Sequence, residues 1–158
     1  MQKMYVSKRD GTLEPLSLDK ILKRIQQKCK GLSDNLDPNK IAIETISYVI
    51  DGISTRKLDE LASKVAATYM LEEPDYTILA SRLSISSMHK DVALDFTKVT
   101  EKLYSNGLLN GTYYKKALKY SDLVNSLYEK YHKLDYDFDY FGWKTLEKSY
   151  LLKKPVEK

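Results

Sequence analysis

The sequence predicts a mostly helical α+β fold. Two patterns support this class: a short strand–turn–strand stretch near the start, and apolar residues at helical spacing in most of the remaining chain. The composition agrees, because 42% hydrophobic and 30% charged residues lie near the averages of globular proteins. A length of 158 residues suits one ordinary domain, or a small domain with an appendage, and not a complete large enzyme.

The chain opens with a predicted β-hairpin. Residues 4–8 are strand-like, Asp10 and Gly11 are a strong turn pair, and residues 13–16 can return as a second short strand. The first helix is expected to begin at Ser17 or Asp19 and to end at Gly31. Its apolar positions follow offsets of three and four and comprise Ile21, Leu22, Ile25 and Cys29.

Three further helices are predicted in the first ninety residues. The second begins at Asp37 and Pro38 and is expected to end at Gly52. Its apolar face comprises Ala42, Ile46, Val49 and Ile50. The third is capped by Ser54 or Thr55 and has the cleanest apolar stripe, made of Leu58, Leu61, Ala62, Val65, Ala66 and Tyr69.

The fourth helix starts at residues 73–75. Tyr76, Leu79, Ala80 and Leu83 share one face, while Ile78 and Ile85 lie on another. Apolar residues on more than one face predict that this helix lies centrally, covered on several sides.

The last third of the chain differs in composition, since nine of the thirteen tyrosines and the single tryptophan follow residue 100. Helical spacing runs from Val92 to Leu103, and Asn-Gly pairs at 106–107 and 110–111 predict turns. A domain boundary is therefore placed near residues 104–112. Residues 120–131 form another amphipathic helix with an aromatic face. Residues 134–140 alternate like a strand, whereas the spacing from Tyr140 onward suits a helix.

Charge and cysteine content exclude several classes. The net charge of +4 is spread along the chain, so we expect a solvated surface and no nucleic-acid partner; phosphate on a small ligand fits better. One cysteine, Cys29, allows neither an internal disulfide nor a Cys-rich zinc site, and it is interpreted as a packing residue in a cytoplasmic protein. Residues 1–4 lack an apolar signal core, and no apolar run is long enough to cross a membrane.

Candidate binding residues gather around the hairpin. Lys8 and Arg9 precede its turn, Glu14 comes after it, and Lys20 lies in the first helical turn. Lysine, arginine and backbone N–H groups at a helix start are what a triphosphate requires; the alternative is a solvated hairpin with surface charges. Catalysis is not expected, because the chain has no G-x-x-x-x-G-K-[ST] phosphate loop and no Ser-His-Asp pattern. A metal site is not expected either, since His89 has no second ligand at helical spacing.

A wider pattern resembles the ATP-cone, the allosteric nucleotide-binding domain of many ribonucleotide reductases. The matching stretches, in order, are Val6-x-Lys8-Arg9-Asp10-Gly11-x-x-Glu14, Asp19-Lys20-Ile21, Gly52-Ile53-x-Thr55-x-x-Leu58, Asp75-Tyr76-x-x-Leu79-Ala80-x-Arg82-Leu83 and His89-Lys90. Residues 137–152 resemble the stretch that enters the catalytic part of class I large chains of eukaryotic and large-DNA-virus type. The tail at Pro155-Val156 departs from that pattern.

The resemblance implies a four-helix bundle capped by a three-stranded sheet in residues 1–104, and a helical part of the reductase large chain in residues 105–158. It also implies that the catalytic barrel is absent, and with a single cysteine the chain lacks the family's several active-site cysteines. The third strand and the order of the sheet come from the resemblance alone.

In that family the cone binds ATP as an activator and dATP as an inhibitor, and we expect Mg²⁺ to accompany the nucleotide. The effector changes how large chains oligomerise and interrupts radical transfer from the small subunit. By position within the matched motifs, the nucleotide-binding residues are Val6, Lys8, Arg9, Glu14, Leu16, Ser17, Lys20, Ile21, Thr55, Asp59 and Lys90. Two alternatives remain: a free-standing nucleotide-responsive module, and a protein-interaction domain that has lost nucleotide binding.

Overall fold

The computed structural model describes residues 4–92 and 95–151. Its contacts separate into two compact units, the first made of Met1–Ser87 with Phe138–Lys158 and the second of Met88–Asp137. The boundary predicted at residue 104 marks the end of the ATP-cone-like domain. The two compact units are defined by contacts alone and do not test it, so it stays a prediction. Expectations about residues 1–3 and about the tail at Pro155-Val156 lie outside the described residues.

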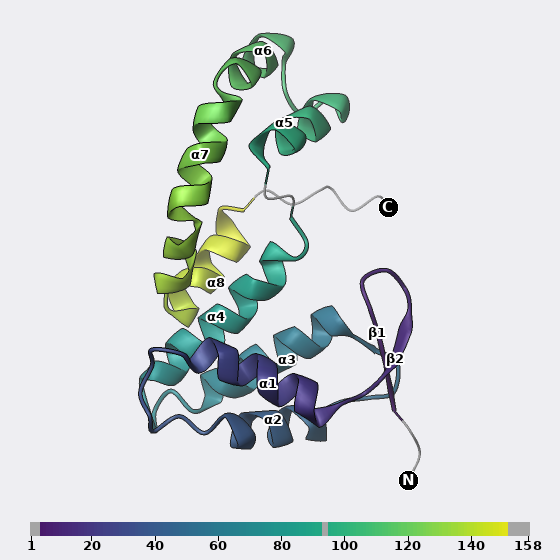
Figure 1. Cartoon of the computed structure of the whole chain (residues 1–158), viewed down its shortest axis with the longest axis vertical. Helices are drawn as coiled ribbons and strands as arrows, with labels where there is room; N and C mark the ends of the chain where they lie inside the picture. The colour runs from purple at the N-terminus through teal and green to yellow at the C-terminus, as the bar shows by residue number, and fades with distance from the viewer. Residues whose placement is uncertain (1–3, 93–94, 152–158) are drawn as a thin grey trace. The chain divides into compact units, whose positions relative to one another are not determined.

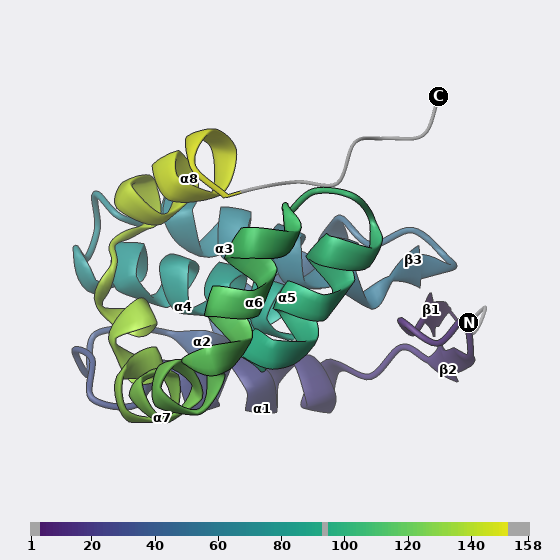
Figure 2. The same cartoon turned by 90° about the horizontal axis from the view of Figure 1, so that it is seen from above.

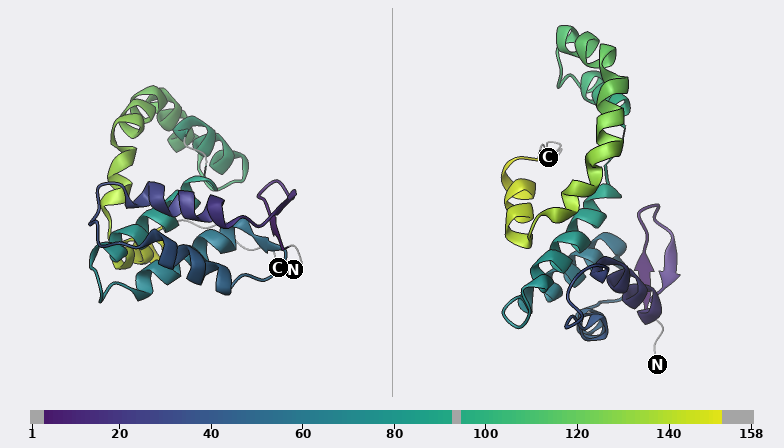
Figure 3. Two further views of the ribbon diagram at one scale, coloured as in Figure 1. Left: turned by 60° about the horizontal axis from the view of Figure 1, so that its bottom comes forward. Right: turned by 60° about the vertical axis from the view of Figure 1, so that its left-hand side comes forward.

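A three-stranded sheet lies at the end of the first unit where two of its helices begin (Figures 1 and 2). Its strands are β1 (Tyr5–Ser7), β2 (Leu13–Pro15) and β3 (Ile53–Ser54), in the order β2-β1-β3. β1 pairs antiparallel with β2 and parallel with β3. The predicted hairpin and the third strand are both confirmed. In both views of Figure 3 the purple hairpin projects past the helices of this unit.

The hairpin turn is fixed by its own side chains. The Asp10 carboxylate accepts hydrogen bonds from the Thr12 backbone N–H (2.9 Å) and hydroxyl (2.7 Å). These bonds lower the pKa of Asp10 from its ordinary value. Gly11 has a φ of 85°, which favours glycine. The turn therefore holds Lys8 and Arg9 at a defined place beside the helix starts.

Helix α1 (Leu18–Cys29) begins at Ser17, whose hydroxyl accepts from the Lys20 N–H at 3.3 Å. It is followed by Gly31 at a φ of 74°. Arg82 donates to the carbonyls of Lys28 (3.0 Å) and Lys30 (2.9 Å), and so satisfies acceptors at the end of the helix.

Helix α2 (Pro38–Ser47) starts at the predicted cap, Asp37, but it ends before the predicted residue. The prediction that it reaches Gly52 is wrong, and Val49 and Ile50 lie beyond its end. A tight turn comes after Ser47 because the next segment pairs with β1: the Gly52 N–H donates to the Tyr5 carbonyl at 2.9 Å. Sheet pairing has outweighed helical spacing here, and Ile50 is left 72% exposed.

Helices α3 (Thr55–Thr68) and α4 (Asp75–His89) complete the bundle. Ser54 caps α3. α4 is buried on more than one face, as predicted, through side chains that include Tyr76, Leu79 and Ile85. Cys29 packs against this core, where burial raises its pKa to about 11. A thiol with so high a pKa is protonated at neutral pH, which agrees with a packing role.

Helix α8 (Tyr140–Ser149) belongs to the same unit and lies beside α4 (Figure 2). Trp143 is 4% exposed, and its indole Nε1–H donates to the Ser84 hydroxyl at 2.8 Å. The Lys144 ammonium donates to the same hydroxyl at 3.0 Å. The Ser84 hydroxyl on α4 thus accepts hydrogen bonds from two residues of α8.

The second unit consists of short helices: α5 (Phe96–Ser105), α6 (Gly111–Lys119), α7 (Ser121–Tyr131) and the 3₁₀ helix η1 (His132–Asp137). The turn predicted at Asn110-Gly111 is instead the start of α6, because the Asn110 side chain accepts from the Tyr113 N–H at 2.8 Å. The strand alternative for residues 134–140 is wrong, and a helix begins at Tyr140. His89 packs in this unit, with Nε2 2.9 Å from the Asp135 carboxylate.

No helix in the described part of the chain combines the length and the apolar character needed to cross a bilayer.

Candidate functional site

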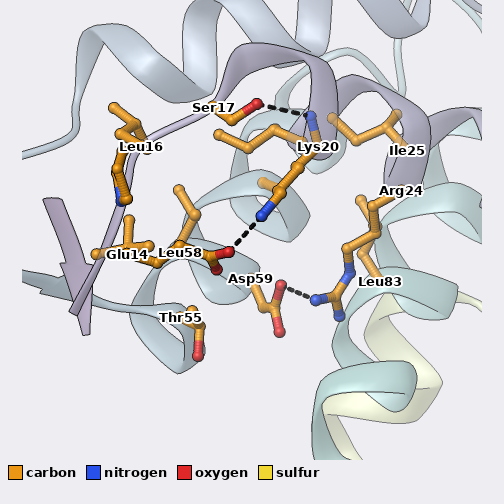
Figure 4. Close-up of a pocket in the computed structure, with 14 residues that line it drawn as sticks. Glu14, Leu16, Ser17, Lys20, Arg24, Ile25, Thr55, Leu58, Asp59 and Leu83 are labelled. Atoms are coloured by element: carbon orange, nitrogen blue, oxygen red, sulfur yellow. Dashed lines mark hydrogen bonds and ion pairs between the residues drawn. The ribbon is translucent and has the colours of Figure 1, made fainter. Parts of the chain in front are cut away.

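A pocket opens between the hairpin, α1 and α3. Its free space, the open mouth included, is about 660 Å³. Its lining residues are Val6, Glu14, Pro15, Leu16, Ser17, Lys20, Ile21, Arg24, Ile25, Thr55, Leu58, Asp59, Ala62 and Leu83. Aliphatic side chains form the inner wall, and charged ones project over it from β2, α1 and α3 (Figure 4).

Two of these charged residues, Glu14 and Lys20, form an exposed cluster with Lys8 of the hairpin. The Glu14 carboxylate binds the Lys8 ammonium at 3.0 Å through one oxygen and the Lys20 ammonium through the other. Both lysines lower the pKa of Glu14, with Lys20 having the larger effect. The three side chains are 44%, 31% and 66% exposed, so water and other anions can compete for these contacts.

The other two, Arg24 and Asp59, form a second cluster with Arg9, which is called the buried cluster after its buried carboxylate. Asp59 lies on α3 with a side chain only 6% exposed, and one of its oxygens contacts the Arg24 guanidinium. Its other oxygen lies 3.8 Å from Nη2 of Arg9. A buried carboxylate needs such partners because desolvation of its charge is costly.

Arg9 also reaches α4. Its Nη2 donates to the Ser87 carbonyl at 3.2 Å and to the Ser87 hydroxyl at 3.0 Å. Its Nη1 lies 3.5 Å from the Thr55 hydroxyl. One guanidinium thereby connects the hairpin to α3 and α4.

A second, shallower pocket lies directly beside the first. Lys8, Arg9, Asp10 and Thr55 line it. Thr55 lines both pockets, so they adjoin at the start of α3. The first pocket is mainly apolar inside and is called the apolar pocket. The second pocket is lined by the two cations Lys8 and Arg9 and is called the cationic pocket.

The structure brings most of the predicted residues together. Those that line the first pocket are Val6, Glu14, Leu16, Ser17, Lys20, Ile21, Thr55 and Asp59. Lys8 and Arg9 line the second pocket. Lys90 comes directly after the last residue of α4 and belongs to the second unit, so its part in this site stays a prediction.

Sequence reasoning missed several residues of the first pocket. Arg24 is the main one, because it supplies a charge to the buried cluster. A signal was present, since Arg24 lies four residues after Lys20 and three after the buried Ile21, and this spacing puts it on their face of α1. The apolar residues that were missed are Pro15, Ile25, Leu58, Ala62 and Leu83.

The arrangement suits a ligand with a flat apolar part and an anionic part. Each cluster contains two cations and one carboxylate, so each carries one excess positive charge. The described residues contain no group of three or more His, Cys, Asp or Glu side chains placed to hold a metal ion. The site offers apolar contact, hydrogen bonds and positive charge to a ligand.

Comparison with known proteins agrees with this geometry. The family model described as "ATP cone domain" matches residues 4–91. The ribonucleoside-diphosphate reductase large subunit of Monkeypox virus is 42% identical over 162 residues, covering 95% of this chain and 20% of that protein. The large subunit of Dictyostelium discoideum is 41% identical over 94% of this chain and 18% of its own length. That of Danio rerio is 39% identical over 95% and 20%. The chain spans about a fifth of the length of these relatives.

Proposed function

Because this chain belongs to the ATP-cone family and is homologous along nearly its whole length to large subunits of ribonucleoside-diphosphate reductase, we propose that it is a nucleotide sensor that binds ATP or dATP as an effector. Kinship with these subunits implies allosteric regulation by nucleotides. The ligand would then be a signal and not a substrate.

One observation carries the proposal: an apolar pocket and a cationic pocket adjoin at Thr55. An adenine nucleotide has the same two-part character, with a flat base at one end and a charged triphosphate at the other. The aliphatic wall made of Val6, Ile21 and Leu58 would contact the base. Lys8 and Arg9 would meet the phosphates.

The exposed cluster would rearrange when the nucleotide arrives. Lys8 and Lys20 hold one carboxylate, whereas a triphosphate offers several negative charges to the same ammonium groups. Glu14, once released, can accept from an amino or hydroxyl group of the ligand. Lys90 would add a further charge to the phosphates.

Mg²⁺ would arrive with the phosphates and would not be held by Asp59 or Asp10. Asp59 is engaged by two guanidiniums, and Asp10 accepts two hydrogen bonds from Thr12. Neither carboxylate is free to enter a metal shell without losing those contacts. The ion would neutralise part of the triphosphate charge.

Regulation would require that ATP and dATP favour different assemblies of large chains, and that one assembly interrupt contact with the small radical-bearing subunit. The two nucleotides differ by one 2′-hydroxyl, so discrimination needs a polar contact that only one of them makes. Coupling between nucleotide and assembly is typically about 1–3 kcal/mol per site. Light scattering with ATP and then with dATP would measure the assembly directly; one mass under both conditions would contradict this part of the proposal.

Calorimetric titration with ATP and dATP tests the binding itself. Lys8→Ala combined with Lys90→Ala should abolish measurable binding, because the phosphates lose two cations, and should leave the helical circular dichroism unchanged. The matched control is Lys64→Ala with Lys116→Ala, which removes the same charge from side chains outside both pockets and should bind like the original chain. Undiminished affinity of the first pair would refute the phosphate contacts. No heat from the unaltered chain with either nucleotide would leave only an interaction module.

A further inference from the structure

One buried hydrogen-bond donor of the pocket, on Arg24, has no acceptor among the described residues. Nη1 of Arg24 contacts Asp59, but Nη2 is buried and has no hydrogen-bond partner among the described residues. The other buried side-chain atoms without a partner in the described part are the Ser81 hydroxyl and Nε of Arg82. Of these three residues, Arg24 alone lines the pocket.

Such a donor needs an explanation. Nearly all buried polar groups in proteins are hydrogen-bonded, and a charged N–H left without an acceptor loses its hydration without compensation. An acceptor supplied from the pocket would relieve it.

The position of Asp59 indicates which part of a nucleotide would supply that acceptor. Arg24 contacts one carboxylate oxygen, and Arg9 approaches the other. Arg9 lines the cationic pocket, whereas Arg24 lines the apolar pocket together with Ile25 and Leu83. Asp59 thus contacts one arginine that lines the second pocket, where the phosphates are proposed to bind, and one that lines the first pocket, where the nucleoside is proposed to bind; Figure 4 shows Arg24 beside Asp59.

We propose that Arg24 is a further ligand-binding residue, whose Nη2–H donates to an acceptor on the nucleoside part of the effector while Nη1 stays on Asp59. The acceptor is a ring nitrogen of the base or an oxygen of the sugar, and not a phosphate oxygen. This inference rests on the proposed nucleotide site. The ion pair between Arg24 and Asp59 would then have two roles: it holds the pocket wall together, and it orients the Arg24 Nη2–H toward the ligand.

Arg24→Lys tests the proposal in the 158-residue chain. Lysine keeps a positive charge for Asp59 but lacks the planar fork, so it cannot contact Asp59 and the ligand in the same geometry. Affinity for ATP should fall roughly tenfold to a hundredfold, as loss of a charge-assisted hydrogen bond predicts. Affinity for inorganic tripolyphosphate, which has no nucleoside, should not change.

Arg82→Lys is the matched control. Arg82 also has a buried guanidinium nitrogen without a partner among the described residues, but it donates to the end of α1 and does not line the pocket. This variant should bind ATP like the original chain even if its melting temperature falls.

A second measurement needs no variant. The side-chain guanidinium signal of Arg24 in ¹⁵N NMR should shift, and its hydrogens should exchange more slowly, on addition of ATP and not on addition of tripolyphosphate. Repeating the titration with dATP tests the 2′-hydroxyl as the acceptor, and repeating it with 7-deaza-ATP tests N7 of the base, because each analogue lacks that one acceptor.

Equal ATP affinity of Arg24→Lys and the original chain would overturn the proposal, as would an equal loss toward ATP and tripolyphosphate. An Arg24 signal indifferent to ATP would overturn it as well. Failure of the proposed function gives a different result, because the unaltered chain would then bind neither ATP nor dATP.

Discussion

The exposed cluster and the buried cluster have the same composition of charges but different surroundings. Each has one carboxylate between two cations, yet Glu14 is 31% exposed in the first and Asp59 is 6% exposed in the second. Ion pairs in water are worth little and exchange partners easily, whereas a buried charge that loses its partner is costly. The pocket therefore combines a movable set of charges at its mouth with a fixed set in its wall.

The largest expected effect comes from Asp59→Ala. The substitution leaves two arginines close together without their shared counter-ion. We expect a loss of about 3 kcal/mol in the free energy of unfolding, the lower end for a broken buried pair because the arginine side chains are 28% and 24% exposed. Urea denaturation followed by circular dichroism measures it. If Asp59→Ala lowered the free energy of unfolding no more than Glu14→Ala does, the buried cluster would be no more important for stability than the exposed one, contrary to the prediction.

A smaller effect is expected at the mouth, on binding and not on stability. Lys20→Ala should lower ATP affinity about fivefold, because one partly hydrated contact to the ligand is lost, and should leave the urea midpoint unchanged. Lys23→Ala is the control, since this residue is exposed on the same helix and lines neither pocket. If Lys20→Ala destabilised the fold as strongly as Asp59→Ala, the exposed cluster would stabilise the fold, and the prediction that it acts on binding alone would be wrong.

The smallest effect is a change in acid sensitivity. The pKa of Glu14 is lowered from its ordinary value of 4.5 by Lys20 and Lys8. Its charged form is therefore favoured by folding: the stabilisation is present above the unfolded pKa and is lost as the pH falls through the lowered one. Glu14→Gln removes this contribution, so its melting temperature should fall less than that of the original chain below about pH 5. Parallel melting curves from pH 7 to pH 3 would contradict the ion pairs.

The local parts of this fold could be predicted because short-range chemistry fixes them. Ser17 and Asp37 act as helix caps, as their positions before apolar stripes indicated. The Asp10-Gly11 turn could be predicted from side-chain bonding and from the φ that glycine tolerates. β3 has only two residues, too few for periodicity, and it was expected only through the resemblance.

The contacts that complete the site could not be predicted, because they join residues far apart in the chain. Arg9 reaches Ser87 across 78 positions, and nothing near either residue indicates the other. Helix α2 ended early for the same reason, since pairing of Gly52 with Tyr5 is a long-range bond. Glu14 and Lys20 are only six positions apart, and this closeness made the exposed cluster the easier one to foresee.

Trp143 gives the molecule a built-in optical probe. It is the single tryptophan of the chain, and its ring is enclosed while its N–H is held by Ser84. Fluorescence from an indole moves toward longer wavelengths when solvent reaches it, so emission colour reports whether α8 remains attached to α4. Ser84 is the next residue after Leu83, which lies in the wall of the pocket. Unfolding can thus be followed by the intrinsic fluorescence of Trp143, without an attached dye.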